Sequence, residues 1–85
     1  MRLRSERLTW REMDGEIVAL DLETQTYLTA NSTASMLFEL MAEGPVTAED
    51  LVSQLLAEFD VEAATATAAV QDFLADLEAR GLLEA

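Results

Sequence analysis

The chain has 85 residues, of which 51% are apolar and 26% charged, and it contains three Gly, one Pro and no Cys or His. This length favours one domain over residues 1–85, because two separate cores would each be too small to fold alone, and the composition excludes a disordered or fibrous chain. The 17 acidic and five basic residues give a net charge of −12, which disfavours nucleic acid and anionic membrane surfaces as partners.

The first elements that the sequence predicts are strands, because residues 8–30 show the period of two that is typical of a sheet. Asp14 and Gly15 separate two alternating runs. This dipeptide is typical of a type I′ hairpin turn, whose two central residues both need positive φ. We therefore expect a three-stranded antiparallel meander over residues 8–30, with its first turn at this dipeptide.

The second and third strands should place their side chains on alternate faces of the sheet. In the second run the alternating residues Val18, Leu20 and Leu22 share one face. A turn at residues 23–24 then leads into a third strand over residues 25–30. Leu28 and Ala30 would share the inward face of that strand, and Tyr27 would lie on the opposite face.

Three helices are predicted after the strands, where the apolar period changes to 3.6. They lie within residues 32–80, and Asn31 offers the first of them an N-cap. Thr47 and Asp50 form a capping box for the second, and Gly81 stands where a left-handed C-cap of the third belongs. The side chains expected to face the core are Ala34, Leu37, Leu40, Met41, Leu51, Val52, Leu55, Leu56, Phe59, Ala66, Val70, Phe73, Leu74 and Leu77. Strands followed by helices indicate an α+β fold of order βββααα, similar to a winged helix-turn-helix, with the helices on one face of the sheet.

The side chains that most often catalyse reactions or bind metals are missing, since a chain without Cys and His has no thiol nucleophile, imidazole base or thiolate ligand. Asp72 and Asp76 lie four residues apart on the third helix and could hold a hard cation, but most such pairs are a solvated helix face. Residues 21–23 resemble half of a calcium loop without its glycine, so we interpret them as a turn. We therefore predict no enzyme activity, no cofactor and no metal site.

Two other classes of small domain fit the sequence less well. An acyl carrier protein needs a serine in an Asp-Ser-Leu context at a helix start, whereas Ser35 and Ser53 lie inside predicted helices in other contexts. A DNA-binding winged helix needs basic residues on its recognition helix, whereas the third helix here has a single base, Arg80. The acidic residues of that helix are Glu62, Asp72, Asp76 and Glu78.

The outer edge of the predicted sheet is the feature that most indicates a use. It consists of Gln25, Thr26, Tyr27, Leu28 and Thr29, and contains no charge, Pro or Gly. Natural proteins usually protect such an edge, so it is either covered by the fold or kept for a partner strand. From the residues alone, both alternatives stay open.

The charges are unevenly distributed, which bears on the kind of partner. The first 11 residues contain one acid and four of the five bases, a charge of +3; these bases are Arg2, Arg4, Arg7 and Arg11. Residues 12–85 contain one base and 16 acids, a charge of −15, which favours a basic peptide as partner. No apolar run reaches the length of a membrane span and the N-terminus lacks the pattern of a signal peptide, so we expect a cytoplasmic protein.

An ordered series of short motifs runs from the end of the third strand to the C-terminus. It consists of Ala30-Asn31-Ser32-Thr33-Ala34, Leu40, Gly44, Thr47-Ala48-Glu49-Asp50-Leu51, Leu55, Phe59, Val70-Gln71-Asp72-Phe73-Leu74, Leu77 and Gly81-Leu82-Leu83. With these spacings the chain resembles the PqqD-like proteins over roughly residues 15–83. Ala30 departs from the family pattern, which usually has Leu at this position.

The resemblance implies a RiPP recognition element, a domain that binds the leader segment of a ribosomally made precursor peptide and is not itself an enzyme. In that family the leader adds as a fourth antiparallel strand beside the third, and its side chains enter a groove next to the third helix. The residues that this places at the peptide are Gln25, Thr26, Tyr27, Leu28, Thr29, Ala69, Asp72, Phe73, Asp76 and Leu77. As alternatives, Phe73 and Leu77 would be pure core, and Asp72 and Asp76 only solvated charges.

Residues 20–27 favour one branch of this family. They are similar to the stand-alone proteins of lasso-peptide pathways, whereas the pyrroloquinoline-quinone type tends to have a Tyr-Pro-Glu-Gly turn there. This implies a non-catalytic adaptor that captures a leader peptide, basic and disordered when free. The adaptor would deliver the peptide to a separate leader peptidase, with a cyclase as a further partner. A PqqD-type chaperone in pyrroloquinoline quinone biosynthesis stays the alternative.

Overall fold

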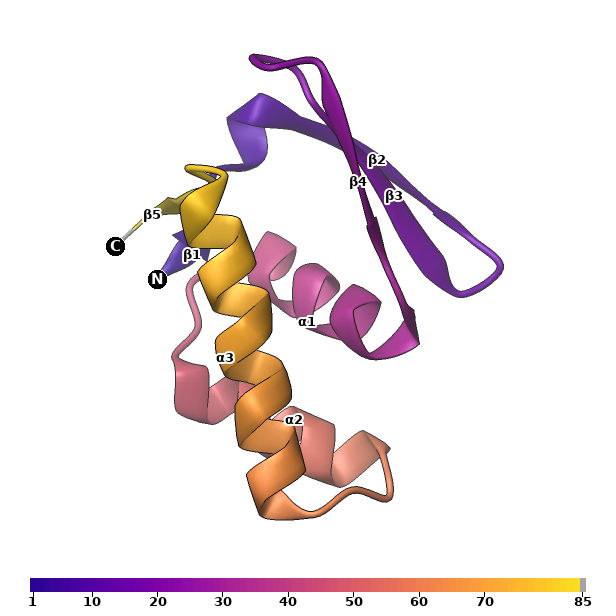
Figure 1. Ribbon diagram of the computed structural model, residues 1–85, viewed down its shortest axis with the longest axis vertical. Helices are drawn as coiled ribbons and strands as arrows, with labels where there is room; N and C mark the ends of the chain where they lie inside the picture. The colour runs from indigo at the N-terminus through magenta and orange to yellow at the C-terminus, as the bar shows by residue number, and fades with distance from the viewer. Residues whose placement is uncertain (85) are drawn as a thin grey trace.

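One layer of the fold is a three-stranded antiparallel sheet in the order β2-β3-β4 (Figure 1). The computed structural model describes residues 1–84. The strands of the sheet are β2 (Leu8–Met13), β3 (Glu16–Asp21) and β4 (Thr26–Ala30), and the helices that follow are α1 (Ser32–Glu43), α2 (Ala48–Glu58) and α3 (Ala63–Ala79). The α+β class and the order of three strands followed by three helices are confirmed.

The helices form the second layer, with α1 beneath the strands and α3 running beside it (Figure 1). Phe38 on α1 is completely buried and meets Trp10 of β2 edge to face, with 5.1 Å between the ring centres. Leu55 of α2 and Val70 of α3 are each 1% exposed, so the three helices share one core with the sheet. Leu56 was expected in this core but is exposed, because α2 packs mainly against α3 and its far side faces solvent.

The two ends of the chain form a second, small sheet that the sequence pattern did not predict. β1 (Arg2–Leu3) pairs antiparallel with β5 (Leu83–Glu84), and a short 3-10 helix, η1 (Ser5–Arg7), connects β1 to β2. Strands of two residues are too short to show a period, and their partners lie at opposite ends of the sequence. The termini therefore lie side by side near the end of α3 (Figure 1).

The turn between β2 and β3 is the predicted one. Asp14 has a φ of 54° and Gly15 a φ of 80°, so both central residues have the positive φ that a type I′ turn requires. Met13 and Glu16 pair directly on either side of the turn, which makes it a two-residue hairpin. The first turn of the meander is therefore specified by the two residues that form it.

The β3 side chains that face the core are not those of Val18 and Leu20 but those of the residues that alternate with them. The buried residues of β3 are Ile17, Ala19 and Asp21. Val18 and Leu20 lie on the outer face and Leu22 is exposed in the following turn, so the residues expected to share one face point away from the core. The inner row can end in a carboxylate because Arg7 neutralises Asp21, with 2.8 Å between Nη2 and Oδ2.

β4 begins at Thr26, one residue later than the sequence pattern indicated. Gln25 has a φ of 58°, and its N–H donates to the carbonyl oxygen of Asp21 (2.7 Å), so it belongs to the turn between β3 and β4. The inward residues of β4 are Leu28 and Ala30, as predicted. Tyr27 lies on the opposite face and is 68% exposed, also as predicted.

The helix ends carry the capping residues that the sequence indicates. Asn31 Oδ1 accepts a hydrogen bond from a backbone N–H in the first turn of α1 (2.9 Å). Thr47 and Asp50 form both hydrogen bonds of a capping box at the start of α2, and the shorter Asp side chain still reaches back at 3.0 Å. Gly81, with a φ of 73°, ends α3 in a Schellman motif.

Candidate functional site

One free edge of the sheet is β4, which pairs only with β3 among residues 1–84. The hydrogen bonds of Ser35 on α1 show which way the backbone groups of β4 point. The Ser35 hydroxyl accepts from the Ile17 N–H (2.8 Å) and donates to the Ala30 carbonyl (2.8 Å). These two backbone groups therefore face each other across the strand pair. Because backbone groups of an antiparallel strand point alternately to its two sides, Tyr27 and Thr29 direct their N–H and C=O groups away from β3. Both residues are exposed, so a further strand could reach these groups.

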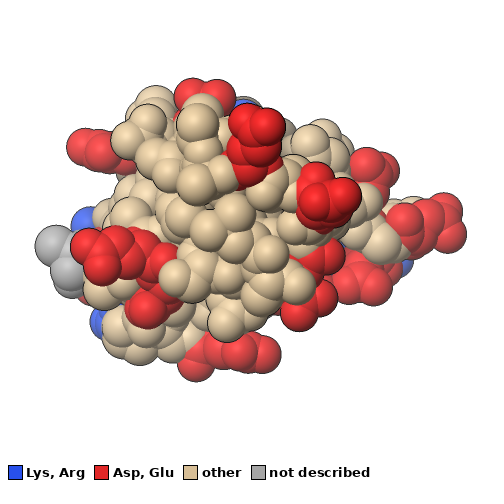
Figure 2. Space-filling model, turned by 90° about the horizontal axis from the view of Figure 1, so that it is seen from below, with Lys and Arg blue, Asp and Glu red and all other residues tan. Residues whose placement is uncertain are grey.

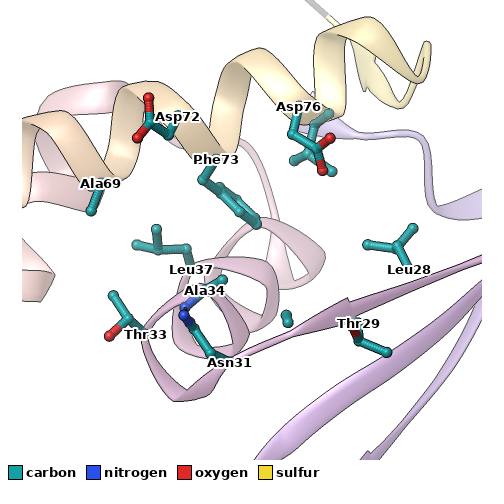
Figure 3. A pocket seen from close by; sticks show the side chains of 12 residues that line it. Leu28, Thr29, Asn31, Thr33, Ala34, Leu37, Ala69, Asp72, Phe73 and Asp76 are labelled. Atoms are coloured by element: carbon teal, nitrogen blue, oxygen red, sulfur yellow. Dashed lines mark hydrogen bonds between the residues drawn. The ribbon is translucent and has the colours of Figure 1, made fainter.

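Beside this edge, a groove of about 440 Å³ lies between β4 and α3, with the start of α1 at its base (Figure 3). It is lined by Leu28, Thr29, Ala30, Asn31, Thr33, Ala34, Leu37, Ala69, Asp72, Phe73, Asp76 and Leu77. The lining comes from β4, from the cap and first turns of α1, and from residues 69–77 of α3. A strand that lay along β4 would therefore also lie beside α3.

The base of the groove is apolar and continuous with the core. Leu28, Leu37 and Leu77 are 7%, 1% and 0% exposed, so they belong to the core as well as to the groove. Phe73 is half-buried, and its ring extends from α3 toward α1 (Figure 3). The two alternatives for Phe73 and Leu77, groove or core, are thus both realised, with Phe73 the more accessible of the two.

The rim of the groove on the α3 side is acidic. Asp72 and Asp76 are both exposed and both line the groove. Asp76 Oδ2 lies 3.1 Å from Arg80 Nε, one turn further along the helix. Asp72 has no ion pair within the part of the chain that the structure describes. A cationic ligand side chain could therefore approach Asp72 without displacing an intramolecular partner.

The structure brings together most of the residues that the sequence placed at the site. Those that line the groove are Leu28, Thr29, Ala69, Asp72, Phe73, Asp76 and Leu77. Gln25 and Thr26, at the start of the expected edge, do not line the groove: Gln25 belongs to the turn, and Thr26 directs its backbone groups toward β3. The backbone groups that remain for a ligand are those of Tyr27 and Thr29.

The Tyr27 side chain lies on the outer face of the sheet, away from the groove. It lines a second hollow, together with Thr9, Trp10, Arg11, Val18 and Leu20. Successive side chains of an added strand point to opposite faces, so Tyr27 and Phe73 would meet different residues of the ligand.

Residues of α1 complete the groove, although the sequence did not place them at the site. They are Thr33, Ala34 and Leu37, together with the N-cap residue Asn31. The sequence indicated Asn31 as a cap and Leu37 as core, and both roles are present in the structure. The signal that could have added them is the short connection, since a single residue between β4 and α1 forces the start of the helix to lie beside the end of the strand.

The charges around the groove do not form a metal site. Figure 2 shows Asp and Glu side chains spread over the face seen from below, with basic side chains only at its margins. Within residues 1–84, no three acidic side chains are grouped so that they could hold a metal ion. None of the helices in the described part of the chain is long and apolar enough to cross a membrane.

Comparison with known proteins supports the assignment of the fold. A family model described as "Coenzyme PQQ synthesis protein D (PqqD)" matches residues 16–83. The solved structure "TbiB1 in Complex with the TbiA(beta) Leader Peptide" is 32% identical, with a TM-score of 0.86 over 99% of this chain and 95% of that chain. "Lasso peptide synthetase B1 complexed with the leader peptide" is 25% identical, with a TM-score of 0.79 over 95% of this chain and 93% of that chain. No curated protein sequence matches the chain.

Proposed function

The chain belongs to the PqqD family, and we propose that it binds the leader segment of a ribosomally made precursor peptide, without chemistry of its own. The observation that carries this proposal is the free edge of β4 beside a groove with an apolar base and an acidic rim. Strand addition uses both features, because main-chain hydrogen bonds give general affinity and pockets for alternate side chains give selectivity. The two similar proteins solved with leader peptides support the same use of this fold.

The register of β4 defines how an antiparallel leader strand would lie. Tyr27 and Thr29 would exchange hydrogen bonds with the leader residues opposite them, whose side chains would point to the outer face of the sheet. The leader residue between those two would lie opposite Leu28 and point inward, toward Phe73. We therefore expect apolar leader side chains at inward positions two residues apart, and a basic side chain near Asp72.

We assign the leader to a lasso-peptide precursor. One of the similar structures is a lasso peptide synthetase B1, and residues 22–25 lack the Tyr-Pro-Glu-Gly turn of the other branch of the family. Delivery of the bound precursor to a separate leader peptidase, and contact with a cyclase, follow from this assignment. The alternative, a chaperone in pyrroloquinoline quinone biosynthesis, is favoured by the name of the family model. Neighbouring genes for a short precursor, a protease and a cyclase would support the lasso assignment, whereas quinone-cofactor genes would contradict it.

A proline at the free edge tests strand addition directly. Thr29→Pro removes an outward N–H but no hydrogen bond of the β3–β4 ladder, and edge positions of this kind tolerate Pro. We expect about tenfold or greater loss of affinity for the leader peptide of the neighbouring precursor gene, because the variant loses a hydrogen bond and its ring occupies the ligand's path. Isothermal titration calorimetry measures the affinity, and circular dichroism shows that the fold is retained.

Thr29→Val is the matched control, because it keeps the size of the side chain and the N–H but removes the hydroxyl. It should bind the peptide as the wild type does. Equal affinities of the Pro and Val variants would rule out strand addition along β4. If the wild-type chain bound neither its neighbouring leader peptide nor the TbiA(beta) leader peptide, the proposed function would be wrong.

A further inference from the structure

Arg7 lies outside the groove and connects the end of β3, which precedes the turn into β4, to the segment that follows α3. Its Nη2 is 2.8 Å from Asp21 Oδ2, and its Nη1 donates to the carbonyl oxygen of Gly81 (3.1 Å). The side chain of Arg7 is only 19% exposed. Asp21 ends β3 and Gly81 follows the last turn of α3, so one guanidinium joins the turn before β4 to the end of α3.

On the strand side, this link holds the whole turn from which β4 departs. Asp21 is 2% exposed, and its Oδ1 accepts hydrogen bonds from the backbone N–H groups of Glu23 (3.0 Å) and Thr24 (3.4 Å). The carbonyl oxygen of Arg7 accepts from the Leu22 N–H (2.7 Å). Arg7 therefore binds the turn through both its side chain and its backbone.

On the helix side, the link ends at Gly81, a position whose backbone conformation and close neighbour favour glycine. Gly81 has a φ of 73°, and a Cβ added there would lie 3.2 Å from Arg7 Nη1, closer than an ordinary contact. The Leu82 N–H donates to the carbonyl oxygen of Leu77 (2.9 Å), which closes the Schellman motif at this end of α3. Leu77 lines the base of the groove, so a displacement of Gly81 would reach the groove through this last turn.

We propose that Arg7 is a positioning residue for peptide binding, which holds the start of β4 and the end of α3 at the separation that an added strand needs. The inference rests on the proposed function, because it assigns a role at the same groove. In Figure 1, the start of β4 and the end of α3 lie on the same side of the molecule as η1, the element that contains Arg7. A preorganised groove binds with a smaller loss of conformational freedom, so loss of the link lowers affinity without removing any contact to the peptide.

A guanidinium is needed because the two bonds leave from two different nitrogens. Arg presents donors on separate nitrogens in a fixed plane, whereas Lys presents a single ammonium. The third nitrogen, Nε, makes no hydrogen bond to the described residues and lies 3.4 Å from Oε2 of Glu23, a side chain that is 70% exposed. This third contact is therefore weak. Arg7→Lys should keep a charge beside Asp21 and lose the bridge to Gly81.

The separation of the groove walls can be measured without any ligand. The chain has no Cys, so Thr26→Cys on β4 and Ala75→Cys on α3, both at exposed positions, give two unique sites for nitroxide labels. Double electron–electron resonance should give a narrow distance distribution with Arg7 and a broader, shifted one with Arg7→Lys. In the unlabelled chain, Arg7→Lys should weaken leader-peptide binding by roughly fivefold, measured by calorimetry with the TbiA(beta) leader peptide or with the chain's own leader peptide once a precursor gene is found.

Arg2→Lys is the matched control, because Arg2 forms an exposed ion pair with Glu84 and does not line the groove. It should leave both measurements unchanged. If Arg7→Lys does not fold, Arg7→Met combined with Asp21→Asn removes the link without leaving a buried charge unpaired, and the same two measurements apply.

Two results would overturn the inference: an unchanged distance distribution, or a changed one with unchanged affinity. Either of them would leave the proposed function standing, because wild-type binding does not depend on this explanation. A wild-type chain that binds no leader peptide would instead overturn the proposed function, and the positioning role with it.

Discussion

Asp21 shows how a carboxylate can be accommodated on the inner face of a small sheet. Burial by itself would raise the pKa of Asp21. Hydrogen bonds from the Glu23 N–H, the Arg7 guanidinium and Thr24 together outweigh burial, so the pKa of Asp21 lies below its ordinary value. The folded state therefore favours the ionised carboxylate, and Asp21 stabilises the fold at neutral pH.

The sign of this pKa shift predicts how the stability contributed by Asp21 depends on pH. A carboxylate whose folded pKa is lowered stabilises the fold above its unfolded pKa of about 4, and this stabilisation is lost as the pH falls through the folded pKa. The free energy of unfolding of wild type should exceed that of Asp21→Asn by a constant amount from pH 7 to about pH 5. The difference should shrink below about pH 4.

Urea unfolding at a series of pH values measures this difference. Asp60→Asn, at an exposed position, controls for the change of net charge. A difference between wild type and Asp21→Asn that stayed the same down to about pH 2 would show that the Asp21 charge has no part in the stabilisation.

At the scale of elements, the Ser35 side chain connects α1 to the end of the sheet by hydrogen bonds. Its hydroxyl bonds both the Ile17 N–H and the Ala30 carbonyl, the residue pair at which the β3–β4 ladder ends. Ser35 is 3% exposed. The hydroxyl is therefore structural and is not accessible for attachment of a carrier group, in contrast to the serine of an acyl carrier protein.

Ser35→Ala should lower the free energy of unfolding by about 1–3 kcal/mol, because a buried N–H and a buried carbonyl lose their shared partner. Ser53→Ala, at an exposed position on α2, is the matched control and should change it by about 0.5 kcal/mol or less. Chemical denaturation of both variants measures the two values. Equal changes in the free energy of unfolding for the two variants would show that the Ser35 hydroxyl does not stabilise the end of the β3–β4 ladder.

Elements that depend on local signals could be predicted from the sequence. Asp14 and Gly15 specify their turn because only a few residue types accept positive φ at both positions. Gly81 specifies the end of α3 for the same steric reason. The groove residues of α3, Asp72 and Phe73 among them, followed from the helical period together with the family resemblance.

Features that depend on distant contacts could not be predicted. The inner row of β3 contains Ala19 and Asp21, and the carboxylate of Asp21 can be buried there because it forms an ion pair with Arg7, which lies in another element. The β1–β5 pair joins the two ends of the chain. Ser35 donates a hydrogen bond to the last residue of β4, and no period of the sequence connects it to that strand.

At the scale of the whole molecule, the charges divide into two groups. Arg2 and Arg7, from the basic N-terminal segment, bind acidic residues elsewhere in the fold, Arg2 at Glu84 and Arg7 at Asp21. The surplus of acids remains on the surface, as the face in Figure 2 shows, and Asp72 extends it to the rim of the groove. Such a field attracts a basic peptide over a distance set by the Debye length, about 10 Å at 0.1 M salt.

We therefore expect association with a basic leader peptide to slow by about tenfold between 20 mM and 500 mM NaCl, with a much smaller change in dissociation. Stopped-flow fluorescence measures both rates. Asp72→Asn and Glu58→Gln remove the same charge, one at the rim of the groove and one on α2. Above 0.1 M salt, only Asp72→Asn should slow association, because screening hides the more distant charge. Equal decreases in the association rate for both variants would show that net charge alone steers the peptide. An association rate that does not change with salt would show that the acidic surface does not steer the peptide.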